Sequence, residues 1–191
     1  MTERKKQIIS RAQKVVKDKG YAATSVRDIA KALNMEPASL YSHFNSKEDI
    51  LAITCFDMAD KFELAVKDVN DIYFNAEEKL RTAIRYHVEL LTQNLDAAII
   101  FIRDWRNLSG ESFDKFIVKR NIYEEGIREI VQTGIDEGIF NETDKKFAAL
   151  TILSSVNWIV EWYKPKGKLN AKEIAEKLSD FILTGLKKEA L

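Results

Sequence analysis

The amino-acid sequence predicts an all-α protein of about nine helices. Apolar residues recur three or four positions apart along the whole chain, and the strict alternation that marks strands is absent. Proline, which interrupts helices, occurs only at positions 37 and 165. With 191 residues, of which 46% are hydrophobic, the chain is long enough to bury the core of one domain, or of a small and a medium domain.

Capping residues and glycines mark where the predicted helices begin and end. Four pairs have the capping-box pattern, a side-chain oxygen three residues before a carboxylate: Ser25 and Asp28, Ser46 and Asp49, Asn75 and Glu78, and Asn170 and Glu173. The first helix has an apolar stripe from Ile8 to Val16 and ends at Gly20. The other helices are expected at about 26–33, 37–44, 47 into the sixties, 76–94, 97–107, 112–137, 144–163 and 170–188. Gly126 and Gly134, inside one of them, indicate either a close helix approach or a bend.

Charge is divided unevenly along the chain, although the formal net charge is zero. Residues 1–47 contain ten basic and four acidic residues, a net charge of +6, so the remaining residues carry −6. A small basic part joined to a larger acidic part is typical of a domain that meets a polyanion, while a solvated lysine-rich helix explains the charge equally well. We therefore predict two domains, 1–47 and 48–191.

The segment from Thr24 to Lys47 reads as a short helix, a tight turn and a second short helix. Asn34 tolerates the left-handed conformation that such a turn requires, and Pro37 at the first helical position loses no hydrogen bond. Two such short helices need the apolar stripe of the first helix, and their own apolar residues are spaced to meet it: Ile29, Ala30, Leu33, Leu40 and Phe44. This pattern predicts a helix-turn-helix, whose second helix enters the major groove of DNA.

The outer face of that second helix is small or polar, which suits a close approach to base edges and phosphates. Arg27 on the preceding helix can reach a base edge or a phosphate, and both alternatives stay open. The complete predicted DNA-binding set is Thr24, Ser25, Arg27, Pro37, Ala38, Ser39, Tyr41, Ser42, His43 and Lys47. The structural alternatives are a core aromatic for Tyr41 and an ordinary surface position for His43.

Three stretches, Thr24–Ala30, Ala38–Phe44 and Ser46–Glu48, resemble the DNA-binding signature of the tetracycline-repressor (TetR) family. The resemblance implies a homodimer whose N-terminal three helices bind a palindromic operator. It also implies that the larger C-terminal domain binds a small effector and that the last two helices form the dimer interface. This chain departs from the family pattern at Asn34, which replaces a turn glycine, and at Glu36, where a Ser or Thr cap is usual. Because a carboxylate repels phosphate, no DNA contact is expected from Glu36.

A second stretch, Asn157–Gly167, is similar to the Asn-Trp…Trp-Tyr-(Arg/Lys)-Pro-x-Gly ending of a TetR subgroup linked to fatty-acid and sterol catabolism. Members of that subgroup respond to acyl-coenzyme A thioesters, which need an apolar tunnel and basic or polar groups for the phosphates. The candidate effector-binding residues are Arg81, Arg85, Tyr86, Phe101, Arg103, Trp105, Arg106, Phe113, Tyr123, Asn157, Trp158 and Trp162. The alternatives are salt-bridged surface arginines and core aromatics.

Three other function classes compete with this interpretation. A TetR-type repressor of an efflux operon would sense aromatic or cationic compounds, with Glu89, Asp104 and Glu161 as candidate carboxylates. A helical partner-binding protein would require neither the basic N-terminal part nor the small, polar helix face. An enzyme is not expected, because the two histidines form no zinc-binding cluster and no phosphate loop or nucleophile elbow occurs.

No catalytic residue, cofactor or metal is therefore predicted. The sequence also predicts no membrane association, since its longest uncharged stretch is too short to span a bilayer and its basic start precedes no apolar region. Its one cysteine, Cys55, is expected to be a buried small hydrophobe, which fits a cytoplasmic location.

Overall fold

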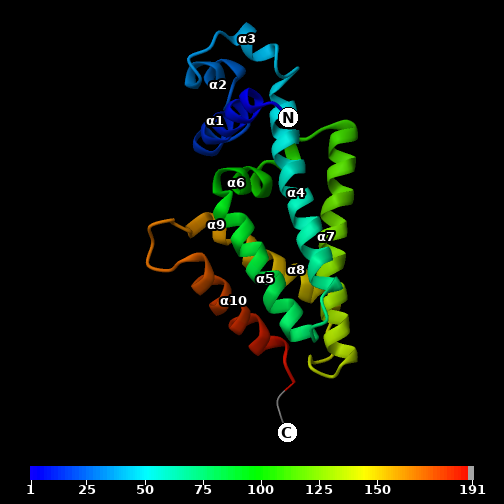
Figure 1. Cartoon of the computed structure of the whole chain (residues 1–191). Coiled ribbons are helices and arrows are strands. Elements are labelled where there is room, and N and C mark those ends of the chain that lie inside the picture. The colour runs from blue at the N-terminus through cyan, green and yellow to red at the C-terminus, as the bar shows by residue number, and fades with distance from the viewer. Residues whose placement is uncertain (189–191) are drawn as a thin grey trace. The chain divides into compact units, whose positions relative to one another are not determined.

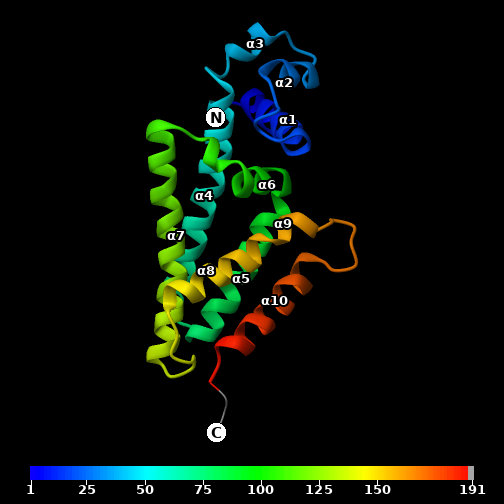
Figure 2. The same ribbon diagram turned by 180° about the vertical axis from the view of Figure 1, so that it is seen from behind.

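The computed structural model describes residues 1–188, and within them the chain is helical, as predicted (Figures 1 and 2). The helices are α1 (Glu3–Lys19), α2 (Val26–Ala32), α3 (Pro37–Tyr41), α4 (Lys47–Asp71), α5 (Ala76–Gln93), α6 (Leu95–Arg103), the 3₁₀ helix η1 (Trp105–Asn107), α7 (Gly110–Asp136), α8 (Lys145–Asn157), α9 (Ile159–Trp162) and α10 (Ala171–Leu186). In the described residues, the β-type backbone pairing consists of one isolated antiparallel bridge between Phe140 and Lys187.

Two compact units divide the chain, and α4 and α7 each continue from one unit into the other. The first unit consists of Met1–Ala59 and Asn94–Ile117, and the second of Asp60–Gln93 with the chain from Val118 onward. The first unit thus contains α1 to α3 together with the start of α4, α6, η1 and the start of α7. The predicted functional boundary at residue 47 stays a prediction.

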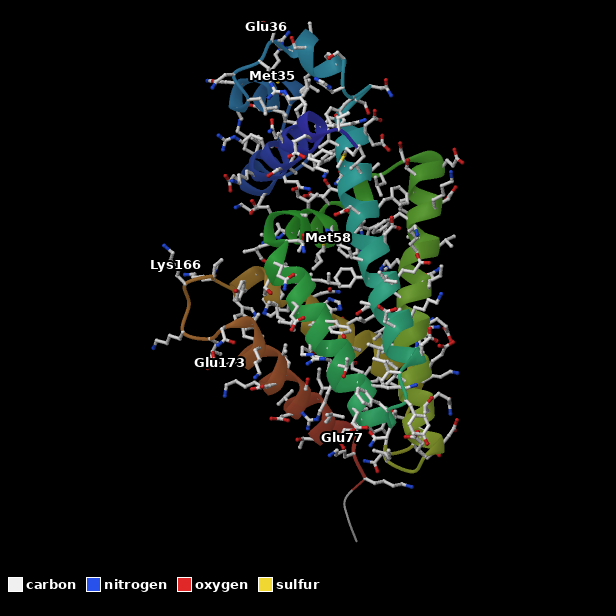
Figure 3. The ribbon with its side chains drawn as sticks, viewed as in Figure 1. Met35, Glu36, Met58, Glu77, Lys166 and Glu173 are labelled. Atoms are coloured by element: carbon white, nitrogen blue, oxygen red, sulfur yellow. The ribbon has the colours of Figure 1, made fainter. Side chains whose placement is uncertain are left out.

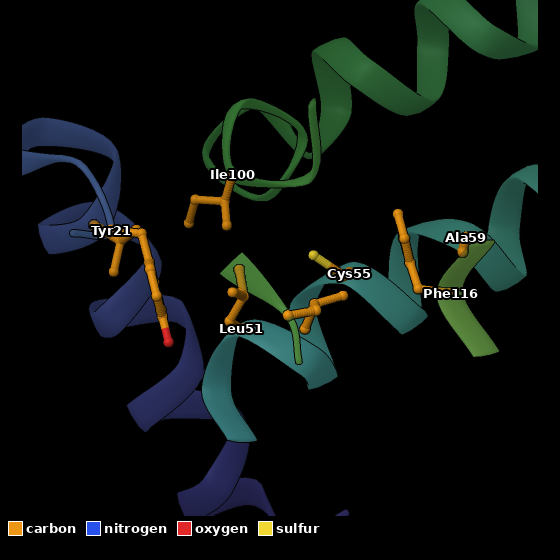
Figure 4. Close-up of a cluster of buried hydrophobic side chains, with 8 residues drawn as sticks. Tyr21, Leu51, Cys55, Ala59, Ile100 and Phe116 are labelled. Carbon is orange, nitrogen blue, oxygen red and sulfur yellow. The ribbon is translucent and has the colours of Figure 1, made fainter. Parts of the chain in front are cut away.

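The first unit has two apolar clusters. In one, the α1 stripe (Ile8, Ile9 and Ala12) packs with Ile29, Leu40, Phe44 and Ile50, which is the packing that the helix-turn-helix pattern predicts. The other joins Val16, Tyr21, Leu51, Cys55, Ala59, Ile100, Leu108 and Phe116 (Figure 4). Cys55 is fully buried there, as predicted, and burial raises the pKa of its thiol to about 12, so the thiol stays protonated at neutral pH.

Three of the four predicted capping boxes are complete, and the fourth, at Ser46, is formed in part. Ser25 and Asn170 cap α2 and α10, and each side chain accepts the backbone N–H of the acidic residue three positions later. The Asn75–Glu78 pair makes both bonds at the start of α5. At the start of α4 the Ser46 hydroxyl accepts the Asp49 N–H, while the Asp49 carboxylate accepts the N–H of Asn45. These local hydrogen bonds fix where the helices begin, because each satisfies N–H groups that a helix leaves without a partner.

Two predicted helices are interrupted. The helix expected over 97–107 ends at Arg103, and the next residues form η1 through bonds between positions three apart, such as the Leu108 N–H to the Trp105 carbonyl. The helix expected over 144–163 divides at Trp158 into α8 and α9, where the Glu161 N–H donates to the Trp158 carbonyl. In both places the tighter turn ends the α-helical hydrogen-bond ladder.

The second unit explains both internal glycines of α7 by close approach. A Cβ atom on Gly126 would lie 2.5 Å from Cγ2 of Val66 in α4, and one on Gly134 would lie 2.1 Å from the ring of Phe140. Elsewhere in the unit α5 packs against α10, and the Arg81–Asp180 and Glu77–Lys187 ion pairs join the two helices. None of the helices in the described residues is both long and apolar enough to cross a membrane.

Candidate DNA-binding face and effector site

The turn before α3 has the geometry that the sequence predicts. Asn34 takes the left-handed conformation, with φ of 53°, and the Met35 N–H donates to the Ala30 carbonyl at 3.0 Å. Pro37 begins α3, while Glu36 before it makes no side-chain capping bond. The turn therefore sets α3 at its angle to α2 through backbone geometry and not through a side-chain cap.

The two faces of α3 differ sharply in burial. Leu40 and Phe44 are 2% and 4% exposed and face α1, whereas Ala38, Ser39 and Ser42 are exposed. Tyr41 is 53% exposed and is therefore not a core aromatic, and Pro37 and His43 are half-buried. The outer face of α3, which we define as Ala38, Ser39, Tyr41 and Ser42, is thus a small, polar and accessible helix surface.

The residues that flank this face are held by the α1–α2 loop. The buried Thr24 hydroxyl donates to the Gly20 carbonyl at 2.8 Å, and the Ser25 hydroxyl caps α2 through Asp28. Lys19 and Ser25 together hold the pKa of the Asp28 carboxyl well below its usual range, so it stays ionised. Arg27 is exposed next to them. The Ser25 hydroxyl and Arg27 are therefore more accessible to a ligand than Thr24 is.

Lys47 has a defined structural role. Its ammonium group donates to the carbonyls of Tyr21 and Thr24, at 2.8 Å each, and lies 4.0 Å from the centroid of the Tyr21 ring. Lys47 thereby ties the start of α4 to the α1–α2 loop. The predicted DNA contact of Lys47 stays a prediction, and it would have to share an ammonium that already has two acceptors.

The effector candidates in the first unit form an aromatic cluster around Phe116. The ring centroids of Phe101 and Trp105 each lie 5.6 Å from that of Phe116, and Trp105 stacks on Phe113 at 5.9 Å. The Arg106 guanidinium lies over the Trp105 ring at 4.5 Å, and Arg103 is exposed. The structure thus brings together four of the predicted residues, Phe101, Trp105, Arg106 and Phe113, and the contacts among the aromatic rings are ones that an apolar core also makes.

In the second unit, a buried histidine connects two of the predicted residues. His87, 4% exposed on α5, has its Nδ1 2.8 Å from the Tyr123 hydroxyl and its Nε2 3.0 Å from Oδ1 of Asn157. Because the Asn157 oxygen only accepts, Nε2–H donates to it and Nδ1 accepts from Tyr123. The Phe62 ring covers this chain, 4.5 Å from the His87 ring and 5.1 Å from that of Tyr123.

This polar chain, Tyr123–His87–Asn157, is electrically neutral. Burial lowers the pKa of His87 to about 4 and raises the pKa of Tyr123, so neither group is charged at neutral pH. Tyr123 and Asn157 were predicted from the sequence as effector candidates, whereas His87 was not. The available signal was a polar residue on the apolar face of the predicted helix over 76–94.

Replacement of His87 by Gln is expected to change the pH dependence of stability. The unfolded chain binds the proton below about pH 6.5, while the folded protein binds it only below about 4. Stability therefore falls as the pH decreases between these values, by up to about 3 kcal/mol. The His87→Gln variant can keep both hydrogen bonds through its amide and has no ring to protonate. It should therefore lose less stability on acidification than the wild type does. Urea unfolding of both proteins from pH 7 to 4 measures the difference, and parallel losses would contradict the assignment.

The remaining candidates lie at or near the surface of the second unit. Arg81 pairs with Glu77 at 3.2 Å and Asp180 at 2.7 Å, which is the salt-bridged alternative. Arg85 is exposed and lies over the Tyr86 ring at 5.3 Å. Trp158 and Trp162 are 65% and 44% exposed.

Two open grooves lie beside these residues. One of about 390 Å³ runs between α5 and α10 and includes Arg81, Arg85 and Lys172. The other, about 270 Å³, lies between α4 and α5 and includes Tyr86 and Glu89. The described residues contain no group of three or more His, Cys, Asp or Glu side chains that could hold a metal ion.

A helix-turn-helix with an accessible α3 face, joined to a larger helical unit that contains a buried polar chain, is the arrangement of a DNA-binding regulator. Comparison with known proteins gives the family. Residues 8–52 match the family model of bacterial regulatory proteins of the tetR family, and residues 74–186 match that of the tetracyclin repressor-like C-terminal domain. The chain belongs to the TetR family, whose members are transcriptional regulators and not enzymes.

Individual relatives align over nearly the whole chain. The transcriptional repressor KstR2 of Mycobacterium tuberculosis is 24% identical over all of this chain and 96% of its own length, and its structure superimposes with a TM-score of 0.93. The fatty acid metabolism regulator protein of Bacillus subtilis is 28% identical over 94% of each chain. AibR, solved in complex with isovaleryl coenzyme A and operator DNA, is 30% identical over 94% of this chain and 97% of its own, with a TM-score of 0.84.

Proposed function

We propose that this chain is a repressor that binds a palindromic operator as a dimer and leaves it when an acyl-coenzyme A thioester is bound. The observation that carries the DNA-binding part is the outer face of α3, which is accessible, small and polar and sits on a helix anchored by Leu40 and Phe44. A helix of this kind enters the major groove, and its small residues let the backbone approach the base edges.

Within the predicted DNA-binding set, the accessible positions are the natural contacts. Ala38 and Ser39 lie at the start of α3, where recognition helices meet base edges, and Tyr41 and Ser42 extend the face toward a phosphate. Ser25 and Arg27 supply a second line of contact from the start of α2. Thr24 and Lys47, which also belong to the predicted DNA-binding set, support these residues by holding the α1–α2 loop.

Dimerisation through α8 and α10 is supported by the apolar side chains that they leave exposed. Phe147 and Phe181 are 69% and 80% exposed, and Leu150 and Trp158 also face outward. Large exposed apolar patches mark association surfaces, and a two-fold interface buries the same patch on both copies. A dimer also suits a palindromic operator, because its two α3 helices then enter successive major grooves about 34 Å apart.

An acyl-coenzyme A effector is supported by the chain's Asn157–Gly167 segment and by its relatives. One relative is a fatty acid metabolism regulator, and another was solved with isovaleryl coenzyme A. The neutral Tyr123–His87–Asn157 chain provides polar groups without charge, which suits a thioester better than a cation. The efflux alternative keeps one favourable feature, the Glu89 carboxylate beside Tyr86 in the groove between α4 and α5.

The proposed switch acts through α4. This helix begins at Lys47 beside α3 and continues into the second unit, so a tilt of its distal part moves the recognition helices of a dimer apart. The effector drives the change only if it prefers the spacing that does not fit DNA. Because operator DNA is the proposed target, we infer that the protein works in the cytoplasm.

Footprinting on DNA upstream of the protein's own gene tests the DNA-binding part. We expect a protected palindrome and an affinity that falls steeply with salt concentration. Tyr41→Ala is expected to weaken binding about tenfold while leaving the circular dichroism spectrum unchanged, because the side chain is outside the core. Uniform weak binding to any duplex, or a Tyr41→Ala variant that binds as well as the wild type, would contradict this assignment.

A further inference from the structure

The loop between α9 and α10 is a concentrated basic segment. Lys164, Lys166 and Lys168 lie at alternate positions, Lys172 is the second residue of α10, and no Asp or Glu stands between Trp162 and Lys172. All four lysines are exposed, and Figure 3 shows Lys166 on the loop, directed away from the helices. We call Lys164, Lys166 and Lys168 the lysine turn.

The backbone of the lysine turn is fixed by local geometry. The Gly167 N–H donates to the Lys164 carbonyl at 2.8 Å, and Pro165 occupies the second position of the turn, which its ring favours. A Cβ atom on Gly167 would lie 2.9 Å from the Lys164 carbonyl oxygen, closer than real Cβ atoms approach, so any other residue there would force the turn to shift. The lysines therefore project from a built turn, which lowers the entropy cost of gathering them around one ligand.

The charge of the lysine turn is not neutralised by the part of the chain that the structure describes. Other lysines of the second unit are paired, such as Lys119 with Asp60 and Glu63 and Lys187 with Glu77, at 2.7 to 2.8 Å. Across residues 1–188, the ion pairs include none made by Lys164, Lys166 or Lys168, and Lys172 makes only a 3.9 Å contact with Glu176. This positive patch lies in the part of the chain, 48–191, whose net charge is −6.

We propose that the lysine turn binds the phosphates of the effector's nucleotide end. The inference rests on the proposed acyl-coenzyme A effector, whose 3′-phosphate and pyrophosphate carry several negative charges. Ammonium groups bind phosphates as mobile point charges, so three on one turn can engage phosphates several ångströms apart. The half-exposed indole of Trp162, directly before the loop, offers a flat surface on which a purine stacks, which favours a nucleotide over a free phosphate.

A comparison of two ligands on two proteins tests this assignment. Octanoyl-coenzyme A carries the phosphates, while octanoyl-pantetheine keeps the acyl chain and thioester without them. For Lys166→Ala/Lys168→Ala we expect about tenfold weaker binding of octanoyl-coenzyme A by calorimetry and unchanged binding of octanoyl-pantetheine. The dependence of octanoyl-coenzyme A affinity on salt should also become less steep. The matched control is Lys145→Ala/Lys146→Ala, two exposed lysines on α8, which should bind both ligands as the wild type does.

The possible outcomes distinguish an error in the proposed effector from an error in the proposed role of the lysine turn. If wild-type protein binds the operator but neither octanoyl ligand, the proposed effector is wrong. If the wild type binds octanoyl-coenzyme A and the lysine-turn variant binds it equally well, the effector stands and the role of the turn is overturned. The role is equally overturned if the variant loses affinity for duplex DNA and keeps its affinity for octanoyl-coenzyme A, because the turn would then contact DNA.

Discussion

Replacement of Ala38 by Glu is expected to weaken operator binding at least about 100-fold without unfolding the protein. Ala38 is exposed at the second position of α3, so the new side chain displaces no core group. A carboxylate in the first turn of a helix is favourable for the helix itself, because it faces the positive end of the dipole. On DNA, the same carboxylate stands among phosphates and holds the helix away from the base edges, once in each subunit of a dimer.

Ala38→Glu is expected to leave protein stability equal or higher and to lower operator affinity, and these opposite directions make the result informative. Thermal unfolding should show a Tm equal to that of the wild type or higher, while gel-shift titration on the footprinted duplex shows the loss. Asn121→Glu makes the same change of charge at an exposed position on α7 and should bind the operator normally. Retained operator affinity in Ala38→Glu would exclude α3 as the helix that enters the groove.

Replacement of Gly134 by Ala is expected to destabilise the protein by about 1–3 kcal/mol. Alanine is ordinarily the better helix former by about 1 kcal/mol, so propensity alone predicts the opposite sign. At this position the added Cβ atom would lie 2.1 Å from the Phe140 ring, and that ring is only 1% exposed. Because Phe140 is an interior side chain with little room to move, the clash outweighs the propensity.

Urea unfolding at a fixed protein concentration measures this change. Asn121→Ala is the matched control, since it places alanine in the same helix at an exposed position and should leave stability equal or slightly raised. If Gly134→Ala proved as stable as the control, the close packing of Phe140 on α7 would be wrong, and the glycine would need another reason.

Features that depend on local chemistry could be predicted from the sequence. The capping boxes, the left-handed Asn34 and the end of α1 at Gly20, with its φ of 81°, each depend on a few neighbouring residues. The helix-turn-helix was predictable for a related reason, because two short helices leave few ways to cover Leu40 and Phe44. The accessible outer face of α3 followed from the same spacing.

Features that depend on tertiary packing were not predictable. The apolar spacing continues across Trp158, so periodicity alone does not reveal the break between α8 and α9. His87 meets Tyr123 and Asn157 from positions 36 and 70 residues away, and no local pattern indicates that encounter. Arg81 was predicted as a ligand contact, but it forms an ion pair with Asp180, which is 99 residues away in the sequence. This pairing uses the charge that a ligand would need.

The most direct test of an acyl-coenzyme A-responsive repressor is release of the footprinted operator duplex by acyl-coenzyme A thioesters of graded chain length. Fluorescence anisotropy of the labelled duplex follows release, and calorimetry on the free protein gives the affinity of each thioester. We predict that at least one thioester releases the DNA, at concentrations that follow its directly measured affinity. Acyl-coenzyme A control of this protein is contradicted if no thioester of any length binds the protein or releases the DNA while an aromatic or cationic compound releases it.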